Sequence, residues 1–477
     1  MSSHHAGFAG SLFDVVPARS TALDPGYRPL ALGLRRYLAA LAEHGSSERV
    51  SIALEQSALS VARLDIDVFP TAAGRDEDNL RYVTYVLSGL IWVAGGWRAT
   101  LGGPSPLCRA VAARYSADGP GKFECEIMAQ SFGRAFEVVT GDVAAVPAPR
   151  KLPLALGGHL DGCRIGFDLG ASDYKVAAVK DGEAIFSTEI PWNPKVEPDP
   201  EYHYRRIQAG LQLAATHLPR VDAIGGSSAG ILVDNQVMVA SLFRAVPREV
   251  FAAKARTIFL RLRQEWGVPF EVINDGDVTA LAGGLSLDRT GILGIALGSS
   301  EAVGFLDGDG HITGWLNELA FGPVDANPQG GTDDWSGNPG VGAAYFSQQA
   351  VGRLAAAAGM SFPDEMQLAD RLKVVQERLA AGDDRAREIF ETIGVYLGYT
   401  IPWYDRFYDL QHAMILGRVT SGAGGDLILS TAGAILEAEF PELARRISIF
   451  LPDEKSRRVG QAVAAASLPV TGRGVAQ

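Results

Sequence analysis

Apolar positions in the first third of the chain follow helical spacing in two segments and strand spacing in two others. Leucines recur at helical spacing from Leu30 to Glu43, which predicts an amphipathic helix. Short apolar runs at Val50–Leu54 and Val61–Val68 predict strands. A longer stretch from about Asn79 to Val93 predicts a buried helix, and the Gly-rich region after it looks irregular. We expect an irregular segment over 1–28 and an α+β domain of unassigned role over 29–150.

A proline-rich linker is predicted between residues 148 and 163, and the sequence after it has a clearer pattern of strands and helices. Arg164–Phe167, Val176–Val179 and Ala184–Ile190 predict three strands, the last two joined by a tight turn at Asp181-Gly182. A helix from about Tyr204 to His217 leads into a further strand that ends in a run of Gly and Ser. These elements alternate in the manner of an α/β lobe, which we place at 163–290.

The same order of elements returns about 125 residues later. Strands are expected at Gly291–Leu297, Ala302–Leu306 and His311–Thr313, with a Gly/Ser turn after the first and an Asp/Gly turn after the second. The later part is expected to be helical near 343–357, 366–380 and 384–410, with a buried strand at Ala413–Leu416. The fold class is therefore α/β, with two duplicated lobes, which we place at 163–290 and 291–470.

Composition and charge exclude some classes of protein but do not indicate a particular chemistry. The chain of 477 residues has a net charge of −12, which argues against broad nucleic-acid binding, since that requires clustered Lys and Arg. The apolar stretch Tyr82–Trp97 is shorter than a membrane span and contains three glycines. Cys108, Cys125 and Cys163 are scattered, so neither a disulfide framework nor a structural zinc site is expected. We expect a cytoplasmic protein with no membrane or nucleic-acid partner.

The first motif with a chemical use is Asp168-Leu-Gly-Ala-Ser-Asp-Tyr-Lys175. A turn without a Cβ at Gly170 lets backbone N–H groups approach phosphate oxygens, and the Ser172 hydroxyl adds a donor. Asp168 at the strand end is suited to hold Mg²⁺ through water, and Lys175 to offset phosphate charge. An ordinary hairpin with a solvated lysine explains the motif about as well.

Two further Gly-rich turns are candidates for the other side of a nucleotide site. Gly298, Ser299 and Ser300 form a strand-to-strand turn of the same kind, although a GSS sequence alone is weak evidence. The segment Ile415–Gly425 is an apolar strand followed by glycines and a helix, so its backbone could lie flat against a nucleoside. Its candidate ATP-binding positions are Gly417, Gly422, Gly424 and Gly425.

Acidic residues supply the candidates for the reaction itself. Asp275 follows the strand Phe270–Asn274, and ligands of open α/β sheets sit beyond the carboxyl ends of strands, so Asp275 is placed to take a proton from a hydroxyl. Asp277 is interpreted more simply as the N-cap of the next helix. Asp334, in a long loop, is a candidate to grip substrate hydroxyls, although solvated turn residues are the commoner case.

Taken in order, these motifs resemble the ROK group (repressor, open reading frame, kinase) of sugar kinases in the actin-like ATPase superfamily. The resemblance covers about two-thirds of the chain and includes Asn317-Glu318-Leu-Ala-Phe321. It implies duplicated actin-like (ribonuclease H-like) lobes, ATP and Mg²⁺ as reactants, Asp275 as the base, Asn274 and Glu318 as contacts to sugar hydroxyls, and a homodimer. It departs from the family's pattern after Glu318, where Gly-His and a Cys-rich zinc loop are usual.

The resemblance favours an ATP-dependent kinase that acts on a sugar, polyol or cyclitol. Two alternatives stay open on the sequence. The first is a non-catalytic sensor that binds sugar or nucleotide and reports through its N-terminal domain. The second is an actin-like ATPase that couples hydrolysis to a protein partner.

Overall fold

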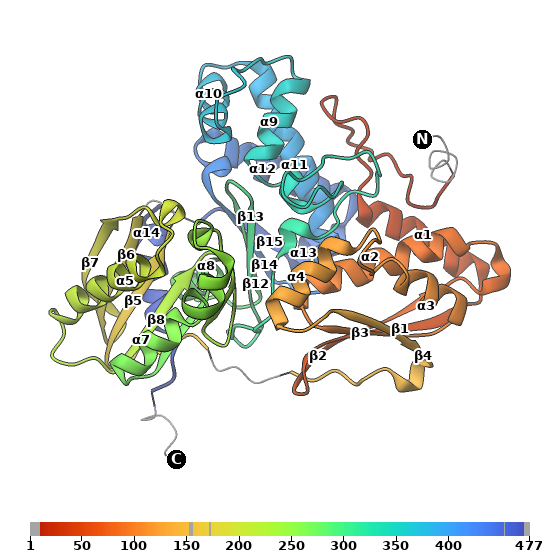
Figure 1. Ribbon diagram of the computed structural model, residues 1–477. Coiled ribbons are helices and arrows are strands. Elements are labelled where there is room, and N and C mark those ends of the chain that lie inside the picture. Colours follow the sequence, from red (N-terminus) through yellow and green to blue (C-terminus); the bar gives the residue numbers. More distant parts are fainter. Residues whose placement is uncertain (1–9, 152–155, 171–172, 453, 472–477) are drawn as a thin grey trace.

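The computed structural model describes residues 10–151, 156–170, 173–452 and 454–471. Figure 1 shows three parts: a sheet with helices at the left, a second sheet at the centre with a group of helices above it, and an N-terminal region at the right. Within the described ranges, no helix combines the length and apolarity needed to cross a bilayer.

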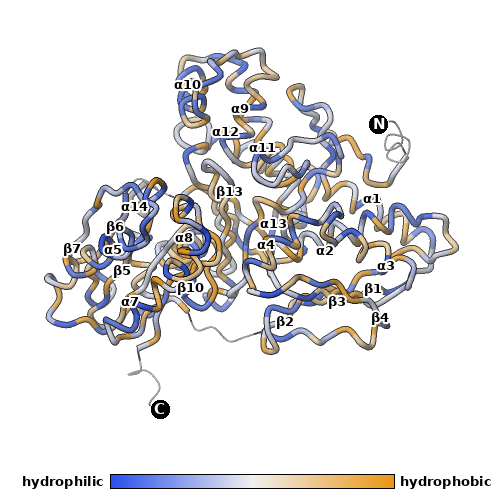
Figure 2. The backbone as a smooth tube through the Cα atoms, in the orientation of Figure 1, coloured by the Kyte–Doolittle hydropathy of each residue, from blue (hydrophilic) through white to orange (hydrophobic). Residues whose placement is uncertain are grey.

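The N-terminal region is a four-stranded sheet covered by helices. The strands lie in the order β2-β1-β3-β4, with β1–β2 and β1–β3 antiparallel and β3–β4 parallel. Figure 2 shows apolar positions concentrated along β1 and β3. The elements are α1 (Leu30–His44), β1 (Glu48–Ser57), β2 (Ser60–Val68), α2 (Asp76–Ala94), β3 (Arg98–Gly102), α3 (Ser105–Ala112), α4 (Lys122–Phe132) and β4 (Glu137–Gly141).

The first four predicted elements of this region are confirmed, and the prediction of an irregular segment after them is wrong. Residues 95–141 contain two strands and two helices. The strands were missed because β3 and β4 are only five residues long and both contain glycine. Parallel pairing with β3, which sequence spacing does not reveal, fixes β4 in place.

The first α/β lobe contains a five-stranded sheet in the order β11-β8-β5-β6-β7. β5, β8 and β11 are parallel, whereas β6 is antiparallel to both of its neighbours. The predicted turn between β6 and β7 is confirmed, with Asp181 and Gly182 at φ 49° and 84°. The strands are β5 (Cys163–Leu169), β6 (Asp173–Lys180), β7 (Glu183–Pro191), β8 (Ala223–Ser228) and β11 (Phe270–Asn274).

Helices and a small hairpin complete this lobe. The predicted helix after β7 is confirmed as α5 (Pro200–Ala215), and α7 (Ile258–Trp266) precedes β11. A short antiparallel hairpin, β9 (Ile231–Val233) and β10 (Gln236–Val239), and the single-turn helix α6 (Arg248–Val250) were not predicted.

The second sheet has the order β13-β12-β14-β15 and repeats part of the first. β12–β13 is antiparallel, and β12–β14 and β14–β15 are parallel, which is the arrangement of β6-β5-β8-β11. The predicted third strand at His311–Thr313 is wrong, because only an isolated bridge joins Ile312 to Leu306. The strands are β12 (Ile292–Leu297), β13 (Glu301–Leu306), β14 (His412–Leu416) and β15 (Ser448–Phe450).

One hydrophobic core joins the second lobe to the N-terminal region, although the sequence suggested separate domains. Side chains of α1 and α2, such as Tyr37 and Trp92, belong to the same buried cluster as Ile295 of β12 and Tyr396 of α11. Helix α1 also contacts α11 directly. The helices of the second lobe are α9 (Gln348–Ala357), α10 (Leu368–Ala380), α11 (Asp384–Tyr404), α12 (Ala423–Glu439) and α13 (Pro441–Arg446).

Two helices, α8 (Asp275–Leu287) and α14 (Glu454–Ala466), pack against each other between the two sheets. Helix α14 contacts β5 and β8 of the first sheet, although it lies within the range 291–470 predicted for the second lobe. Two glycines on adjacent strands, Gly166 and Gly225, permit this approach. A Cβ at Gly166 would lie 1.8 Å from the carbonyl oxygen of Ala462, and a Cβ at Gly225 would lie 1.7 Å from that of Ala465.

The substitution Gly225→Ala is therefore expected to displace α14 and destabilise the protein. Overpacking of this kind typically costs about 1–3 kcal/mol, which thermal unfolding should register as a lower Tm. Gly433→Ala in α12 is the matched control, because a Cβ there meets nothing within 4 Å and alanine favours helix. An unchanged or higher Tm for Gly225→Ala would contradict the packing of α14.

Candidate active site

The carboxyl ends of three parallel strands gather the candidate residues of the first lobe. Asp168 of β5 pairs in register with Ser227 of β8, and Ser227 pairs with Ile273 of β11. The chain continues from Asn274 directly into α8, whose first residue is Asp275. Because parallel strands end at one edge of a sheet, Asp168 and Asp275 lie at the same edge.

Asp168 is held by a neighbour that the sequence analysis did not select. Its Oδ1 accepts a hydrogen bond of 2.8 Å from the Ser227 hydroxyl, and the Lys175 Nζ lies 4.0 Å from its Oδ2. Burial raises the pKa of Asp168, while Ser227 and Lys175 act in the opposite direction. Ser227 could have been found from the strand register, but not from any motif.

The turn after β5 has the close backbone packing that a glycine permits. A Cβ at Gly170 would lie 2.7 Å from the Asp173 carbonyl oxygen, and the Trp192 indole N–H donates to the Gly170 carbonyl at 2.8 Å. Ser172, the predicted hydroxyl donor, lies outside the described residues. Within the described part of the chain, no group of three His, Cys, Asp or Glu side chains is arranged to hold a metal ion.

Asp275 is half-buried at the start of α8. Burial, and then the nearby charge of Asp168, raise its pKa to about 6. A carboxylate with this pKa is ionised at neutral pH and is a stronger base than an exposed aspartate. Asn274 is the N-cap of α8, since its Oδ1 accepts from Gly276 N at 2.7 Å and its amide donates to Gly230 O at 2.8 Å.

The interpretation of Asp277 as the N-cap is therefore wrong. Asp277 is buried, and its Oδ1 accepts from the backbone N–H of Phe305 at 3.2 Å and from the Asn317 amide at 2.8 Å. The Tyr408 hydroxyl in turn donates to Asn317 Oδ1 at 2.9 Å. Burial raises the pKa of Asp277 to about 7, against these hydrogen bonds. The network ties α8 to the segment that carries Glu318.

The N-terminal region positions Glu318 through the end of α2. The backbone N–H groups of Leu316, Asn317 and Glu318 donate to the last carbonyls of that helix, at Ala94, Val93 and Trp92, over 3.2, 2.9 and 2.9 Å. These carbonyls have no partner within the helix, so the segment satisfies them. Burial, then Asp275 and Asp277, raise the pKa of Glu318 to about 8. Glu318 therefore belongs to the same acidic cluster as the predicted base.

Glu301 is a further acid that the sequence analysis missed. It follows the Gly298–Ser300 turn in β13 and is 3% exposed. Tyr404 donates to its Oε1 over 3.3 Å, whereas Oε2 is buried without a hydrogen-bond partner. Burial raises the pKa of Glu301 to about 8, and the charge of Glu318 adds to this effect. A Glu directly after a Gly/Ser turn was the only signal in the sequence.

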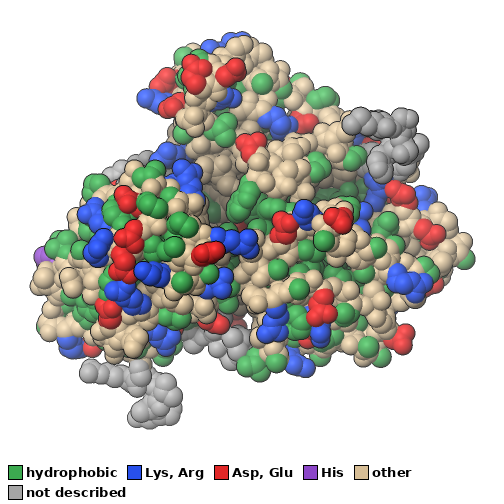
Figure 3. Space-filling model, in the orientation of Figure 1, with side chains coloured by type: hydrophobic (Ala, Val, Ile, Leu, Met, Phe, Trp, Pro, Cys, Tyr) green, Lys and Arg blue, Asp and Glu red, His purple; other side chains and the backbone are tan. Residues whose placement is uncertain are grey.

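The two Gly-rich turns of the second lobe lie against each other. A Cβ at Gly417 would lie 2.4 Å from the Leu297 carbonyl oxygen, so the turn after β14 packs on the end of β12. Ser299 and Ser300 are exposed, and Gly422, at φ 69°, has open space around it. Figure 3 shows a hollow between the first lobe at the left and the helices at the top.

The surroundings of three other candidates, Gly424, Gly425 and Asp334, are set by contacts within the second lobe. A Cβ at Gly424 would lie 2.7 Å from the Phe390 ring, and one at Gly425 would lie 2.3 Å from the Thr420 carbonyl oxygen. These glycines are buried, and the absence of a side chain at each permits close packing within the protein. Asp334 is exposed, and its backbone N–H donates to Gln349 Oε1 at 3.1 Å. No contact of Asp334 links it to the acidic cluster.

The start of the long loop after Glu318 packs against aromatic side chains of the N-terminal region and of the loop itself. The ring of Phe321 lies 4.9 Å from Trp92 of α2, 5.1 Å from Phe123 of α4 and 5.2 Å from Trp335, between ring centroids. Aromatic pairs at these separations add to the burial of apolar area. The segment that follows Glu318 is thus fixed against the N-terminal region.

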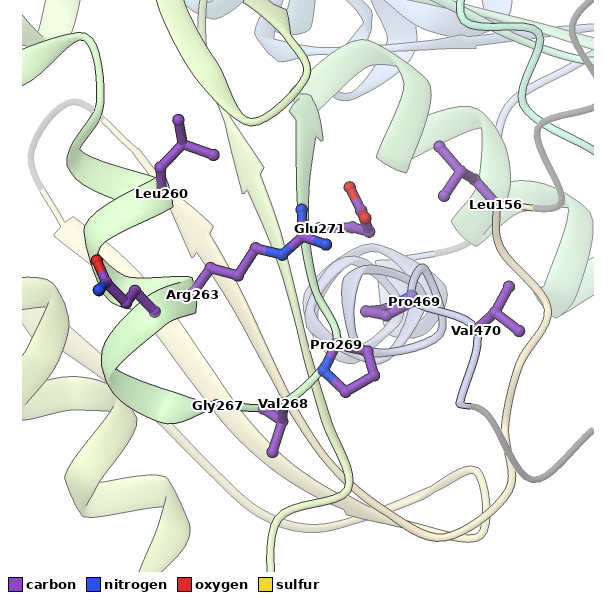
Figure 4. Close-up of a pocket in the computed structure, with 10 residues that line it drawn as sticks. Leu156, Leu260, Arg263, Gly267, Val268, Pro269, Glu271, Pro469 and Val470 are labelled. Atoms are coloured by element: carbon purple, nitrogen blue, oxygen red, sulfur yellow. The ribbon is translucent and has the colours of Figure 1, made fainter.

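Two of the cavities that adjoin the first lobe differ in their distance from the acidic residues. One of about 670 Å³ is lined by α7, Pro269, Glu271 and the C-terminal residues Pro469 and Val470, and Figure 4 shows Arg263 extending toward Glu271 there. It lies at the amino end of β11, away from the strand ends that carry Asp168 and Asp275. The other, of about 410 Å³, includes Asn274 and Asp277 in its wall.

Comparisons with known proteins show the fold. No family model matches the chain, and no curated protein matches it. Among solved structures, the ROK hexokinase from Thermus thermophilus aligns over 64% of this chain and 97% of its own, with a TM-score of 0.50 and 17% identity. The predicted resemblance to ROK sugar kinases is therefore confirmed at the level of the fold.

Two other matched structures belong to the same group by their descriptions. A ROK family transcriptional regulator, a homologue of the E. coli MLC protein, aligns over 65% of this chain and 78% of its own (TM-score 0.49, 19% identity). A ROK family glucokinase from Streptomyces griseus, solved with glucose and AMPPNP, aligns over 64% and 98% (TM-score 0.46, 20% identity).

The buried carboxyl groups predict that the protein loses stability as the pH rises. Glu301 binds its proton more tightly in the folded than in the unfolded state, so its contribution is lost between about pH 4.5 and 8. Glu301→Gln should leave Tm unchanged at pH 4 and raise it by roughly 1–3 °C at pH 8.5. Exposed Glu437→Gln is the control, and equal effects of the two variants at pH 8.5 would contradict the burial of an acid at 301.

Proposed function

We propose that the protein is an ATP-dependent kinase that transfers the γ-phosphoryl group of MgATP to a hydroxyl of a sugar, polyol or cyclitol. One observation carries the proposal. Asp275 begins α8 at the carboxyl edge of the first sheet, close enough to Asp168 for that charge to raise its pKa. A base beside a phosphate-binding hairpin, in the fold of a hexokinase, is the arrangement that phosphoryl transfer to an alcohol requires.

In this proposal the nucleotide lies between the two duplicated lobes. Gly170 in the β5–β6 turn and Lys175 of β6 take the phosphates from one side, and the Gly298–Ser300 turn takes them from the other. Asp168 holds the Mg²⁺ of MgATP through water, which suits a cation that keeps several waters. Gly417 and Gly422 face the adenosine, and closure of the lobes excludes water.

Asp275 accepts the proton of the acceptor hydroxyl as its oxygen bonds to the γ-phosphorus and the bond to the bridging oxygen of ADP breaks. The products are MgADP, the new phosphate ester and a protonated, neutral Asp275, so the total charge is conserved. Glu318, coupled to Asp275 by charge, is positioned for other hydroxyls of the same acceptor. Asn274 keeps one amide hydrogen for such a contact, because its other groups bind Gly276 and Gly230.

A sensor that binds sugar without turnover is the second candidate. The observation that favours it is the attachment of the Glu318 segment to the N-terminal region, through the end of α2 and the aromatic contacts of Phe321. A ligand that moves Glu318 would thereby move the N-terminal region. This arrangement supplies a route for a signal, whereas a kinase needs none.

Measuring ADP release with a panel of sugars, polyols and cyclitols separates the candidates. Turnover that an acceptor stimulates supports the kinase. Tight binding without turnover supports the sensor, and slow hydrolysis that no acceptor changes supports an ATPase coupled to a protein partner.

Asp275→Asn should lower kcat by about 10²–10⁴-fold, which is the usual contribution of a general base. Binding of a non-hydrolysable ATP analogue, measured by calorimetry, should remain within about twofold, since the base does not touch the nucleotide. Asp288→Asn, in the αL position at the other end of α8, is the control. Substantial turnover in Asp275→Asn would remove Asp275 from the role of base.

The pH dependence of the reaction gives a separate test of the base. Only the ionised carboxylate accepts a proton, and the pKa of Asp275 is about 6. We expect kcat/KM to fall about tenfold per pH unit below pH 6 and to level off above it. A profile that is flat between pH 5 and 7, in a protein that stays folded, would disagree with this assignment.

A further inference from the structure

The cavity of about 410 Å³ lies where three parts of the chain meet. The N-terminal region contributes Phe132 of α4 and residues of the β1–β2 hairpin, including Ser57 and Ser60. The first lobe contributes the β9–β10 hairpin and Asn274, and the segment 312–316 closes the remaining side. Helix α4 also contacts β9 and β10 directly, so the N-terminal region reaches the first lobe as well as the second.

The cavity is lined by one residue assigned to the acceptor, Asn274, and by a neighbour of the proposed base in the chain, Asp277. Asn274 and Asp277, which line it, flank Asp275 in the first turn of α8. The segment 312–316 in its wall leads directly into Asn317 and Glu318. Asp275 and Glu318 do not line the cavity themselves, but Asn274, which the proposal assigns to an acceptor hydroxyl, does. The cavity volume is within the range of small-molecule sites, about 300–1,000 Å³.

The lining has the chemistry of a site for neutral hydroxyl-rich compounds. Phe132 and Trp315 supply aromatic surface, while Ser57, Ser60 and Thr313 supply hydroxyl groups that donate and accept hydrogen bonds. Aromatic rings cover the C–H faces of such compounds. Acidic side chains outnumber the one arginine in the wall, Arg263, which disfavours an anionic ligand.

The hairpin wall is held in place before any ligand binds. The Gln56 amide donates to Ala94 O at the end of α2 and, over 3.1 Å, to Gly314 O. The Ser60 hydroxyl donates to Gln56 Oε1 at 2.6 Å. These bonds join the β1–β2 hairpin to the segment 312–316 across the cavity, so the ordering cost of the wall does not fall on ligand binding.

We propose that this cavity is the acceptor pocket, that the acceptor is a neutral polyhydroxylated compound, and that the β1–β2 hairpin forms the distal wall that selects it. The inference rests on the proposed function, because it names the acceptor of that site. It also assigns the N-terminal region a role in specificity. An acceptor with a substituent beyond the reacting ring would reach Ser57 and Ser60.

Ser57→Trp tests the pocket by filling it from the exposed side of the hairpin. Leu59→Trp is the matched control, since Leu59 is 63% exposed in the same hairpin and does not line the cavity. The panel contains glucose, N-acetylglucosamine, myo-inositol, maltose and trehalose, with gluconate and glucose 6-phosphate as anionic members. We expect Ser57→Trp to raise the acceptor KM by about tenfold or more without changing the ATP KM. Ser57→Leu, a smaller insertion, should give an intermediate effect.

The outcomes distinguish a failure of the pocket assignment from a failure of the proposed kinase activity. Turnover stimulated by a neutral acceptor, with an acceptor KM that Ser57→Trp leaves unchanged, overturns the pocket and leaves the kinase standing. If no panel member stimulates turnover, but calorimetry shows a neutral member whose binding Ser57→Trp weakens and Leu59→Trp does not, the pocket stands and the kinase fails. Response to the anionic members alone, or no binding by any member, overturns the inference.

Discussion

The register of β5, β8 and β11 is the constraint on which the candidate site depends. Asp168, Ser227 and Ile273 lie side by side on the three parallel strands, and each strand ends one residue after them. A slip of one residue in either ladder would turn Asp168 or the start of α8 toward the opposite face of the sheet. The buried carboxyl groups repel one another, so only a rigid sheet edge keeps them together. Burial raises the pKa of both Asp168 and Asp275, and the charge of Asp168 adds to the effect on Asp275.

The N-terminal region is joined to this edge and is not an independent appendage. Its core is continuous with that of the second lobe, and the last carbonyls of α2 accept the backbone N–H groups of the Glu318 segment. The sequence lacks the Cys-rich loop that the ROK group usually carries after this glutamate. In its place, Phe321 packs on Trp92 and Phe123. A region that fixes the segment carrying Glu318 is well placed to influence the surroundings of that acid.

Much of the fold could be predicted from the sequence, because most elements carry a strong local signal. The turn at Asp181-Gly182 and the buried helix α2 are examples. The missed strands β3 and β4 are short, contain glycine and depend on pairing between distant residues. The acids Asp168 and Asp275 could be placed at a sheet edge from pattern alone. Ser227, Glu301 and the cap at Asn274 required the register and the packing, which no single stretch of sequence encodes.

The most direct test of the account is to follow the phosphoryl group itself. The protein is incubated with ATP labelled in its γ-phosphate and with the neutral acceptor that binds most tightly, and the labelled products are separated. The account predicts label in a phosphate ester of the acceptor, formed in step with ADP. Label found only in inorganic phosphate, or remaining in ATP, would contradict phosphoryl transfer at this site.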